Sequence, residues 1–289
     1  MAVNGDPGHD DWFDIAIHTS GISWVQARVD GGPRIALERD RRTGDWIGQV
    51  PTGAHYVIAV SGDRLALDPR ATEVWFPPGH SRDANKPNGS LRDADFPRAV
   101  AASWPRRGPQ RHTTRPLVVY EAHVRGLTAR RDRPAAGTFR AAIDELPRLA
   151  DLGVSVLELL PVHQYDPDEG NYWGYMPLVF GAVHRQYAAG DRPAEELAEL
   201  VDAAHDHDIE VWLDVVVNHT TEADPAGPSY SLRILDEREY YVVHPDGTYL
   251  DDAGTGNVVD AHSPQSRRLI MECLDRFADL GVDGFRFDL

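Results

Sequence analysis

The chain has 289 residues, enough for about two domains of ordinary size. Hydrophobic residues make up 42% and charged residues 26%, which is usual for a globular protein and excludes collagen-like, coiled-coil and wholly disordered chains. Acidic residues outnumber basic ones by 46 to 29, and the formal charge of −17 would repel a phosphate backbone. Nucleic acid is therefore not an expected partner.

Three features of the sequence bear on the cellular compartment: its first residues, its longest apolar runs and its cysteine content. Residues Met1 to Asp14 are acidic and lack the basic stretch and apolar core of a secretory signal. No apolar run approaches the ~18 residues of a membrane span, so no membrane partner is expected. Cys273 is the single cysteine, which excludes an internal disulfide and fits a reducing compartment. We therefore expect a cytoplasmic protein.

The first part of the chain consists of short alternating or β-branched runs separated by Gly, Asp and Pro. These runs cover residues 13–18, 23–29, 35–38, 46–50 and 55–60. Strands of this length and spacing predict an antiparallel β-sandwich over residues 1–76. Trp24 and Trp46 either fill its core or form a platform for a sugar, and the core is favoured because aromatic residues of a sandwich usually lie inside. Residues 77–116 are rich in Pro, Arg, Gly and Asp without periodicity, which predicts a linker.

After residue 116 the pattern changes to alternating strands and helices. The expected strands cover residues 117–124, 154–160, 209–217 and 284–288, and the expected helices cover 138–152, 194–207 and 263–281. Pro147 implies a late start or a kink in the first of these helices. Ser263 and Gly281 are typical residues for the beginning and the end of the last one. The alternation predicts a parallel α/β sheet or barrel.

Polar side chains gather where the predicted strands end, which is where catalytic groups lie in parallel sheets and barrels. Arg286 and Asp288 are two residues apart in one strand and therefore share a face. Asp214 interrupts an apolar strand, and an Arg on the neighbouring strand would offset the cost of burying it through a bidentate contact. A structural ion pair inside the sheet would explain the same two residues. The accompanying His and Tyr residues favour a functional site.

Two of these strand ends carry a family resemblance. D-V-V-V-N-H-T at 214–220 and G-F-R-F-D at 284–288 resemble signature regions of the α-amylase superfamily of glycoside hydrolases. The finer similarity is to its glycogen-debranching, isoamylase-type members, through Y-E-A-H-V-R-G-L-T at 120–128, L-L-P-V-H at 159–163, N-Y-W-G-Y at 171–175, G-P-S-Y-S at 227–231, Y-Y at 240–241 and G-T-G-N at 254–257. The resemblance implies a starch-binding-like β-sandwich followed by the first half of a (β/α)8 TIM-type barrel, with four strand-helix units in residues 117–289.

The resemblance also implies a role for each matching site residue. Asp288 would be the nucleophile that forms a covalent glucosyl intermediate in a retaining mechanism. Arg286 would keep it ionised through opposite charge. Asp214 would organise Arg286 and the sugar hydroxyls, His219 would hydrogen-bond to the glucose at the cleavage site, and Tyr175 would stack on it. The implied partner is an α-glucan such as glycogen or a branched maltodextrin.

The sequence departs from the family after the fourth strand. The superfamily's general acid Glu and its later His-Asp pair lie further along the chain than these 289 residues, so the chain is expected to be inactive alone. No cofactor is expected. Asn218 is a calcium ligand in many amylases, but debranching relatives vary, and no metal is predicted. The acidic residues Asp166, Asp168 and Glu169 are interpreted as solvated loop charge rather than a calcium site, and H-D-H-D at 205–208 as a polar helix end.

The leading hypothesis is hydrolysis of α-1,6 branch linkages in glycogen by the parent enzyme. A branching transglycosylase and a maltooligosyl-trehalose hydrolase share the sandwich, the barrel and the nucleophile. The N-Y-W-G-Y and G-T-G-N motifs favour debranching over both. A non-catalytic α-glucan-binding protein is the alternative from another class, because aromatic residues suited to sugars are present without the acid.

Overall fold

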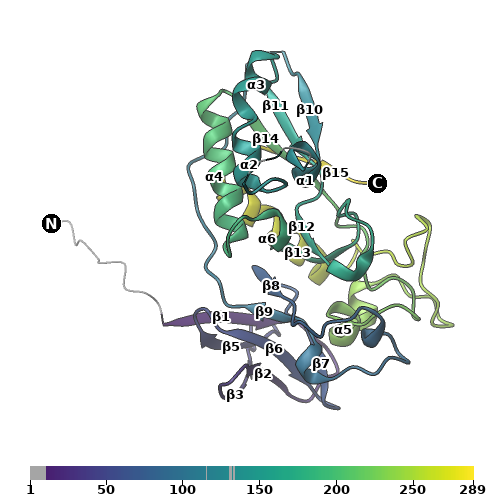
Figure 1. The fold of residues 1–289 in the computed structure, drawn as a ribbon. Helices are drawn as coiled ribbons and strands as arrows, with labels where there is room; N and C mark the ends of the chain where they lie inside the picture. The colour runs from purple at the N-terminus through teal and green to yellow at the C-terminus, as the bar shows by residue number, and fades with distance from the viewer. Residues whose placement is uncertain (1–10, 115, 130–131, 133) are drawn as a thin grey trace.

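The computed structural model describes residues 11–114, 116–129, 132 and 134–289. An N-terminal β domain lies beside an α/β domain that is built on a parallel sheet (Figure 1). The first ten residues of the predicted sandwich range fall outside the described residues. No described helix combines the length and the apolar character that a membrane span requires.

Two antiparallel sheets make up the N-terminal domain. Its strands are β1 (Trp12–Ile17), β2 (Val25–Val29), β3 (Arg34–Ala36), β4 (Glu38–Arg39), β5 (Trp46–Pro51), β6 (His55–Val60), β7 (Arg64–Ala66), β8 (Glu73–Trp75) and β9 (Arg98–Val100). One sheet has the order β1-β5-β4 and the other β3-β2-β6-β9-β8, with β7 beside β6. Ile17, Val50 and Ile58 are fully buried. Trp24 and Trp46 lie half-buried against this core, as the core interpretation expects.

The boundary predicted between sandwich and linker is wrong, because β9 lies inside the range 77–116. This strand pairs with both β6 and β8, so the N-terminal sheets continue to Val100. A three-residue strand is too short to show a period, and Arg98 further hides its apolar character. Arg98 is buried because its guanidinium pairs with Asp30 at 2.9 Å and donates to backbone carbonyls, including that of Asp93.

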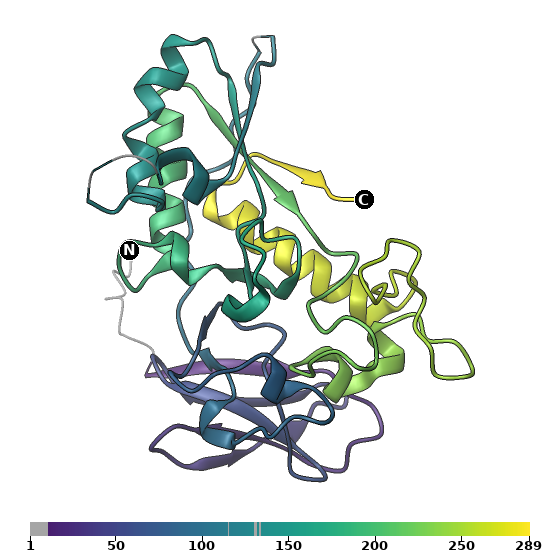
Figure 2. The same ribbon diagram turned by 45° about the vertical axis from the view of Figure 1, so that its right-hand side comes forward.

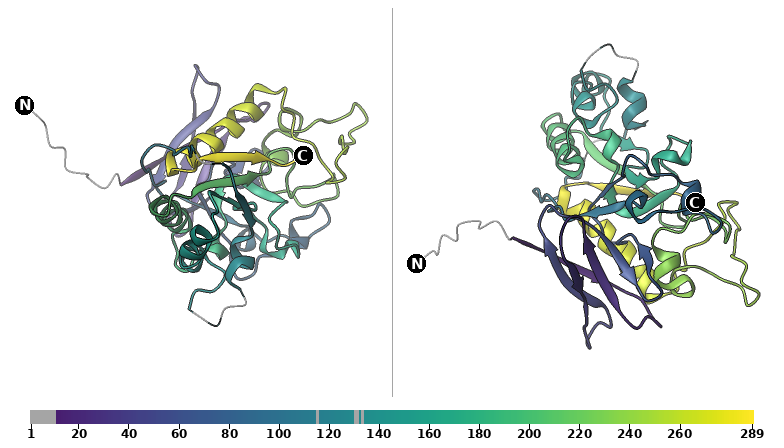
Figure 3. Two further views of the ribbon diagram at one scale, coloured as in Figure 1. Left: turned by 90° about the horizontal axis from the view of Figure 1, so that it is seen from above. Right: turned by 60° about the horizontal axis from the view of Figure 1, so that its bottom comes forward.

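The α/β domain is organised around four parallel strands in the order β10-β11-β14-β15 (Figure 2). They are β10 (Val119–Ala122), β11 (Val156–Leu159), β14 (Glu210–Val215) and β15 (Gly284–Phe287). The helices are α1 (Val124–Thr128), α2 (Phe139–Ile143), α3 (Leu146–Asp151), α4 (Pro193–Asp206), α5 (Leu232–Tyr240) and α6 (Pro264–Leu280). Helix α6 lies between the parallel strands and the N-terminal sheets (Figure 3). All four predicted strands are present, each shorter than its sequence pattern.

The helix ends follow the local sequence. The Ser263 hydroxyl accepts hydrogen bonds from the backbone N–H groups of Gln265 and Ser266 and so caps α6, and Gly281 ends the helix at φ 105°. The single helix predicted over residues 138–152 is two helices, α2 and α3. Pro147 lies in the first turn of α3, where a missing N–H is harmless, which is the late start that the proline implied.

One antiparallel hairpin and two helices were not predicted. The hairpin consists of β12 (His163–Tyr165) and β13 (Pro177–Val183), and β13 is buried at every residue. It follows β11 and carries the N-Y-W-G-Y loop between its strands. Helices α1 and α5 are short, and α5 is interrupted by non-helical backbone at Asp236. Their apolar residues are too few to produce a helical period, so packing rather than pattern decides their conformation.

Charged contacts join the two domains. Arg70, which follows β7, donates from Nε to Glu272 on α6 at 2.5 Å and from Nη1 to the backbone carbonyl of Ala16 at 2.9 Å. Arg276, one turn further along α6, donates to the backbone carbonyl of Arg70 at 2.8 Å. The contact between β1 and α6 is therefore fixed by two guanidinium groups, one from each domain.

Candidate active site

The carboxyl ends of β14 and β15 bring three charged side chains together. Asp214 and Arg286 are partners in the parallel register. Nη1 of Arg286 lies 2.9 and 3.0 Å from the two carboxylate oxygens of Asp214 and 2.7 Å from Oδ1 of Asp288. The predicted contact between Asp214 and Arg286 is confirmed. The predicted bidentate fork is wrong, because a single guanidinium nitrogen serves both carboxylates.

Asp214 is the buried member of this group, with 3% of its surface exposed. The Tyr175 hydroxyl donates to its Oδ2 at 2.8 Å. Burial raises the pKa of Asp214, and the hydrogen bonds from Tyr175 and Arg286 oppose this rise. These two hydrogen bonds replace the water that the buried carboxylate has lost. The bond from Tyr175 also fixes its hydroxyl at the end of β14.

His219 lies beside Tyr175. Its Nε2 is 2.6 Å from the backbone carbonyl of Tyr175, so Nε2–H donates and Nδ1 is the acceptor of a neutral ring. Burial lowers the pKa of His219. Nδ1 is buried and has no hydrogen-bond partner among the described residues. The ring therefore has an unused hydrogen-bond acceptor next to Tyr175, and a sugar hydroxyl is a suitable donor to it.

A second histidine, His163, ties the end of β14 in place. Its Nδ1–H donates to the backbone carbonyl of Phe180 at 2.5 Å, and its Nε2 accepts from the backbone N–H of Val216 at 3.2 Å. Burial lowers the pKa of His163 to about 4. A neutral, fully bonded ring thus links β13 to the strand end that carries Asp214. Sequence reasoning missed this role, although L-L-P-V-H was noted as a motif.

The acidic loop between β12 and β13 is held by the N-terminal domain. Asp166 is fully buried and accepts hydrogen bonds from Nε2 of His80 at 3.0 Å and from the Tyr230 hydroxyl. Glu169 pairs with Arg82 at 2.7 Å. The prediction of solvated loop charge is therefore wrong for Asp166 and Glu169. His80 and Arg82 lie more than eighty positions earlier in the chain and Tyr230 lies 64 positions later than Asp166, so local sequence does not reveal these donors.

Metal ligands are not clustered in the part of the chain that the structure describes, where no group of three or more His, Cys, Asp or Glu could hold an ion. In the H-D-H-D segment, Nε2 of His205 pairs with Asp283 at 2.8 Å, and His207 is exposed. Oδ1 of Asn218 is buried without a described partner, while its carbonyl accepts from the backbone N–H of Val259 at 2.8 Å.

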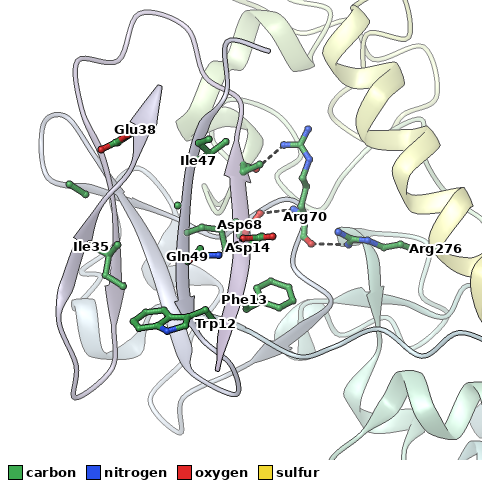
Figure 4. A pocket seen from close by; sticks show the side chains of 14 residues that line it. Trp12, Phe13, Asp14, Ile35, Glu38, Ile47, Gln49, Asp68, Arg70 and Arg276 are labelled. Atoms are coloured by element: carbon green, nitrogen blue, oxygen red, sulfur yellow. Dashed lines mark hydrogen bonds between the residues drawn. The ribbon is translucent and has the colours of Figure 1, made fainter. Parts of the chain in front are cut away.

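A separate cleft is lined mainly by the N-terminal domain and is bordered by Arg276 of α6. It has a volume of about 850 Å³ and runs along β1, β3 and β5 (Figure 4). Trp12 and Ile47 are exposed at its wall, and the Gln49 amide donates to Asp14 at 2.8 Å. The cleft contains none of the residues at the ends of β14 and β15.

Comparison with known proteins gives a consistent result. Residues 127–258 match the α-amylase catalytic domain family. A glycogen debranching enzyme of Dickeya chrysanthemi is 36% identical over 96% of this chain and 48% of its own length. A homolog of the glycogen operon protein GlgX from Haemophilus influenzae is 35% identical over 83% of this chain and 40% of its own length.

Solved structures agree in fold. The catalytic module of the glycogen-degrading pneumococcal virulence factor SpuA superposes with a TM-score of 0.78 at 24% identity, over 96% of this chain and 45% of that one. A putative α-amylase from Salmonella typhimurium gives 0.70 at 26% identity, over 98% and 43% of the two chains.

The chain therefore belongs to the α-amylase superfamily of glycoside hydrolases. Within it, the chain resembles the N-terminal portion of glycogen debranching enzymes, and it spans about half the length of the relatives that it matches.

Proposed function

We propose that residues 1–289 form the N-terminal portion of a glycogen debranching enzyme that hydrolyses α-1,6 branch linkages by a retaining mechanism. In this proposal the four parallel strands are the first half of a (β/α)8 barrel. The observation that carries it is the position of the Arg286 guanidinium, 2.7 Å from Asp288 and 2.9 Å from Asp214 at the carboxyl ends of two adjacent strands.

The proposed mechanism begins with attack by the Asp288 carboxylate on the anomeric carbon of the glucose that joins the branch to O6 of the main chain. The bond from this carbon to O6 breaks as the main-chain oxygen takes a proton, and water later hydrolyses the glucosyl ester. Nη1 of Arg286 donates to Oδ1 of Asp288 at 2.7 Å and so orients the attacking carboxylate. Tyr175 and His219 contact the glucose ring, and Asp214 holds Arg286 and Tyr175 in position.

The carboxyl groups of the described residues are poorly placed to act as the proton donor of this mechanism. A retaining glycosidase places its acid about 5 Å from the nucleophile. Asp214 is committed to Tyr175 and Arg286. Glu158 is paired in register with Glu121 and with Trp212, which precedes Asp214 by two residues, so both glutamates lie one layer deeper. We infer that the donor comes from outside these residues and that residues 1–289 alone bind glucan without hydrolysing it.

The first experiment uses the protein expressed from its whole gene. It should release linear chains from glycogen, detected as reducing ends, and Asp288→Asn should lower the rate by several orders of magnitude. Asp275→Asn, on the exposed side of α6, is the matched control and should leave the rate unchanged. Retention of the rate in Asp288→Asn would overturn the assignment of the nucleophile.

The products separate debranching from the related activities. Loss of branch points without new ones supports debranching, whereas new branches made from amylose would identify a branching transglycosylase. Release of trehalose from maltooligosyl trehalose would identify the other hydrolase. Residues 1–289 alone should be retained by glycogen in a native gel without releasing reducing ends. Turnover by this shorter chain would contradict the inference about the proton donor.

A further inference from the structure

We propose that Tyr172 and Trp173 form a stacking platform for the glucan unit next to the reacting glucose. We call these two residues the aromatic platform. This inference rests on the proposed function, because it takes the residues around Asp288 to bind an α-glucan, and it adds a subsite that selects for chain length.

The two side chains form an exposed stack. Their ring centroids are 4.8 Å apart with an angle of 26° between the ring planes. Tyr172 is 44% and Trp173 45% exposed. By contrast, Tyr187 and Tyr230 of the same domain are 1% and 0% exposed, while Phe287 at the end of β15 is 55% exposed. Two stacked rings that keep almost half of their surface in solvent are suited to receive a flat apolar face.

A buried histidine holds the platform from beneath. Nε2 of His123 donates to the backbone carbonyl of Tyr172 at 2.8 Å, and its Nδ1 accepts from the backbone N–H of Gly126 at 3.0 Å. The second contact fixes the proton of the neutral ring on Nε2, and burial lowers the pKa of His123. The His123 ring meets Tyr172 edge-on at 4.8 Å and Trp173 at 6.1 Å. The platform is therefore rigid before any ligand arrives.

The backbone connects the platform directly to the candidate site. The Trp173 N–H donates to Oδ1 of Asn171 at 3.1 Å. Gly174 follows at φ +90°, where a Cβ would lie 2.7 Å from the carbonyl oxygen of Pro161. Only glycine fits this turn, and the next residue is Tyr175, whose hydroxyl donates to Asp214. One constrained residue thus separates the platform from the ring that contacts the site.

The chemistry of the surface favours a sugar chain. The apolar C–H face of a glucose unit covers an aromatic ring, while its edge hydroxyls stay in water, and preformed rings lose little conformational entropy on binding. A two-ring surface is small for a protein partner, which buries about 800 Å² on each side. An α-glucan that occupies the site at Asp288 continues into a neighbouring unit, and Gly174 alone separates the platform from Tyr175, whose hydroxyl donates to Asp214.

The test measures binding of maltohexaose by residues 1–289 with calorimetry. Trp173→Ala should weaken the affinity by about tenfold, the loss of one well-placed contact. Tyr172→Ala should weaken it in the same direction, and Trp173→Phe should recover most of the loss because it keeps a flat ring. Trp12→Ala is the matched control, since Trp12 is 53% exposed but lies on the N-terminal domain. Melting temperatures of all variants check that each is folded.

Each outcome decides the proposal. Unchanged affinity in Trp173→Ala, or no binding by the parent chain, would overturn it. A loss confined to Trp12→Ala would assign binding to the cleft of the N-terminal domain and would also overturn it. The proposed function is tested separately by Asp288→Asn in the whole enzyme. If that variant keeps its turnover while Trp173→Ala loses affinity, the assignment of the nucleophile fails and the aromatic platform stands.

Discussion

Arg286 and Asp214 come from neighbouring parallel strands, 72 positions apart in the sequence, and meet through one guanidinium nitrogen that also bonds to Asp288. Arg286 is 45% exposed at its side chain, whereas the Asp214 side chain is 4% exposed. The buried carboxylate is thus neutralised by a cation that still reaches solvent. This geometry makes the ionisation of Asp214 depend on Arg286.

We expect Arg286→Ala to raise the pKa of Asp214 further, because burial already raises it and the cation opposes that rise. Carbon-13 NMR titration of the Asp214 carboxyl group measures the change directly. Arg286→Lys should show a smaller rise, since it keeps the charge. Arg267→Ala, an exposed arginine on α6, is the control. An unshifted Asp214 in Arg286→Ala would contradict this reading of the contact.

His163 should make the fold sensitive to acid. Its pKa is about 4 in the folded protein and about 6.5 in the unfolded chain, so the unfolded state binds more protons between these values. Stability should therefore fall as the pH drops from 6.5 to 4, by an amount on the order of 3 kcal/mol from this residue. His163→Gln should flatten the dependence in that window while lowering stability at neutral pH. Urea titrations at several pH values measure it, with the exposed His262→Gln as the control.

The buried hydroxyl of Tyr230 should stabilise the loop that leads to Tyr175. It donates to Asp166, whose pKa is lowered by hydrogen bonds from His80 and Tyr230 against the effect of burial. Tyr230→Phe should cost about 2 kcal/mol, as expected for a hydrogen bond to a charged group. Because the lowered pKa contributes stability that is lost in acid, the variant should also lose less as the pH falls below about 4.

Chemical denaturation near pH 7 and pH 3 measures both effects. Tyr172→Phe removes a hydroxyl from a half-exposed tyrosine and serves as the matched control. Equal stability of Tyr230→Phe and the parent chain would mean that His80 and the backbone N–H of Asp168 are enough to satisfy Asp166.

Alanine should be poorly tolerated at position 284, because Trp212 on the neighbouring strand lies close to it. A Cβ at this position would lie 2.8 Å from two atoms of the Trp212 ring. The Trp212 indole is held by a hydrogen bond from Nε1 to Glu210 at 2.9 Å, so it has little freedom to move away. Gly284→Ala should destabilise the protein by about 1–3 kcal/mol through overpacking. Gly108→Ala, where a Cβ meets nothing within 4 Å, should have no comparable effect in the same urea titration.

Much of the candidate site follows from local sequence. Arg286 and Asp288 share a face because side chains alternate along a strand, and the apolar pattern around Asp214 identifies its strand. Because parallel strands end at the same edge of a sheet, the sequence also predicts that Asp214 lies close to Arg286 and Asp288. The ends of α6 are equally local, because Ser263 and Gly281 satisfy backbone groups within their own turns.

Other features depend on contacts that no local pattern encodes. Asp166 looks like solvated charge in the sequence, and the approach of His80, 86 positions earlier, and of Tyr230, 64 positions later, makes it a buried acceptor. The same holds for β9, a three-residue strand that exists because β6 and β8 pair with it. His163 carries no signal of its tautomer, since the backbone carbonyl of Phe180 that accepts its proton is brought to it by packing. Alternation and capping are properties of neighbouring residues, whereas burial and the choice of partner belong to the assembled chain. The sequence alone therefore determined where the strands end, and the tertiary structure decided which contacts hold those ends.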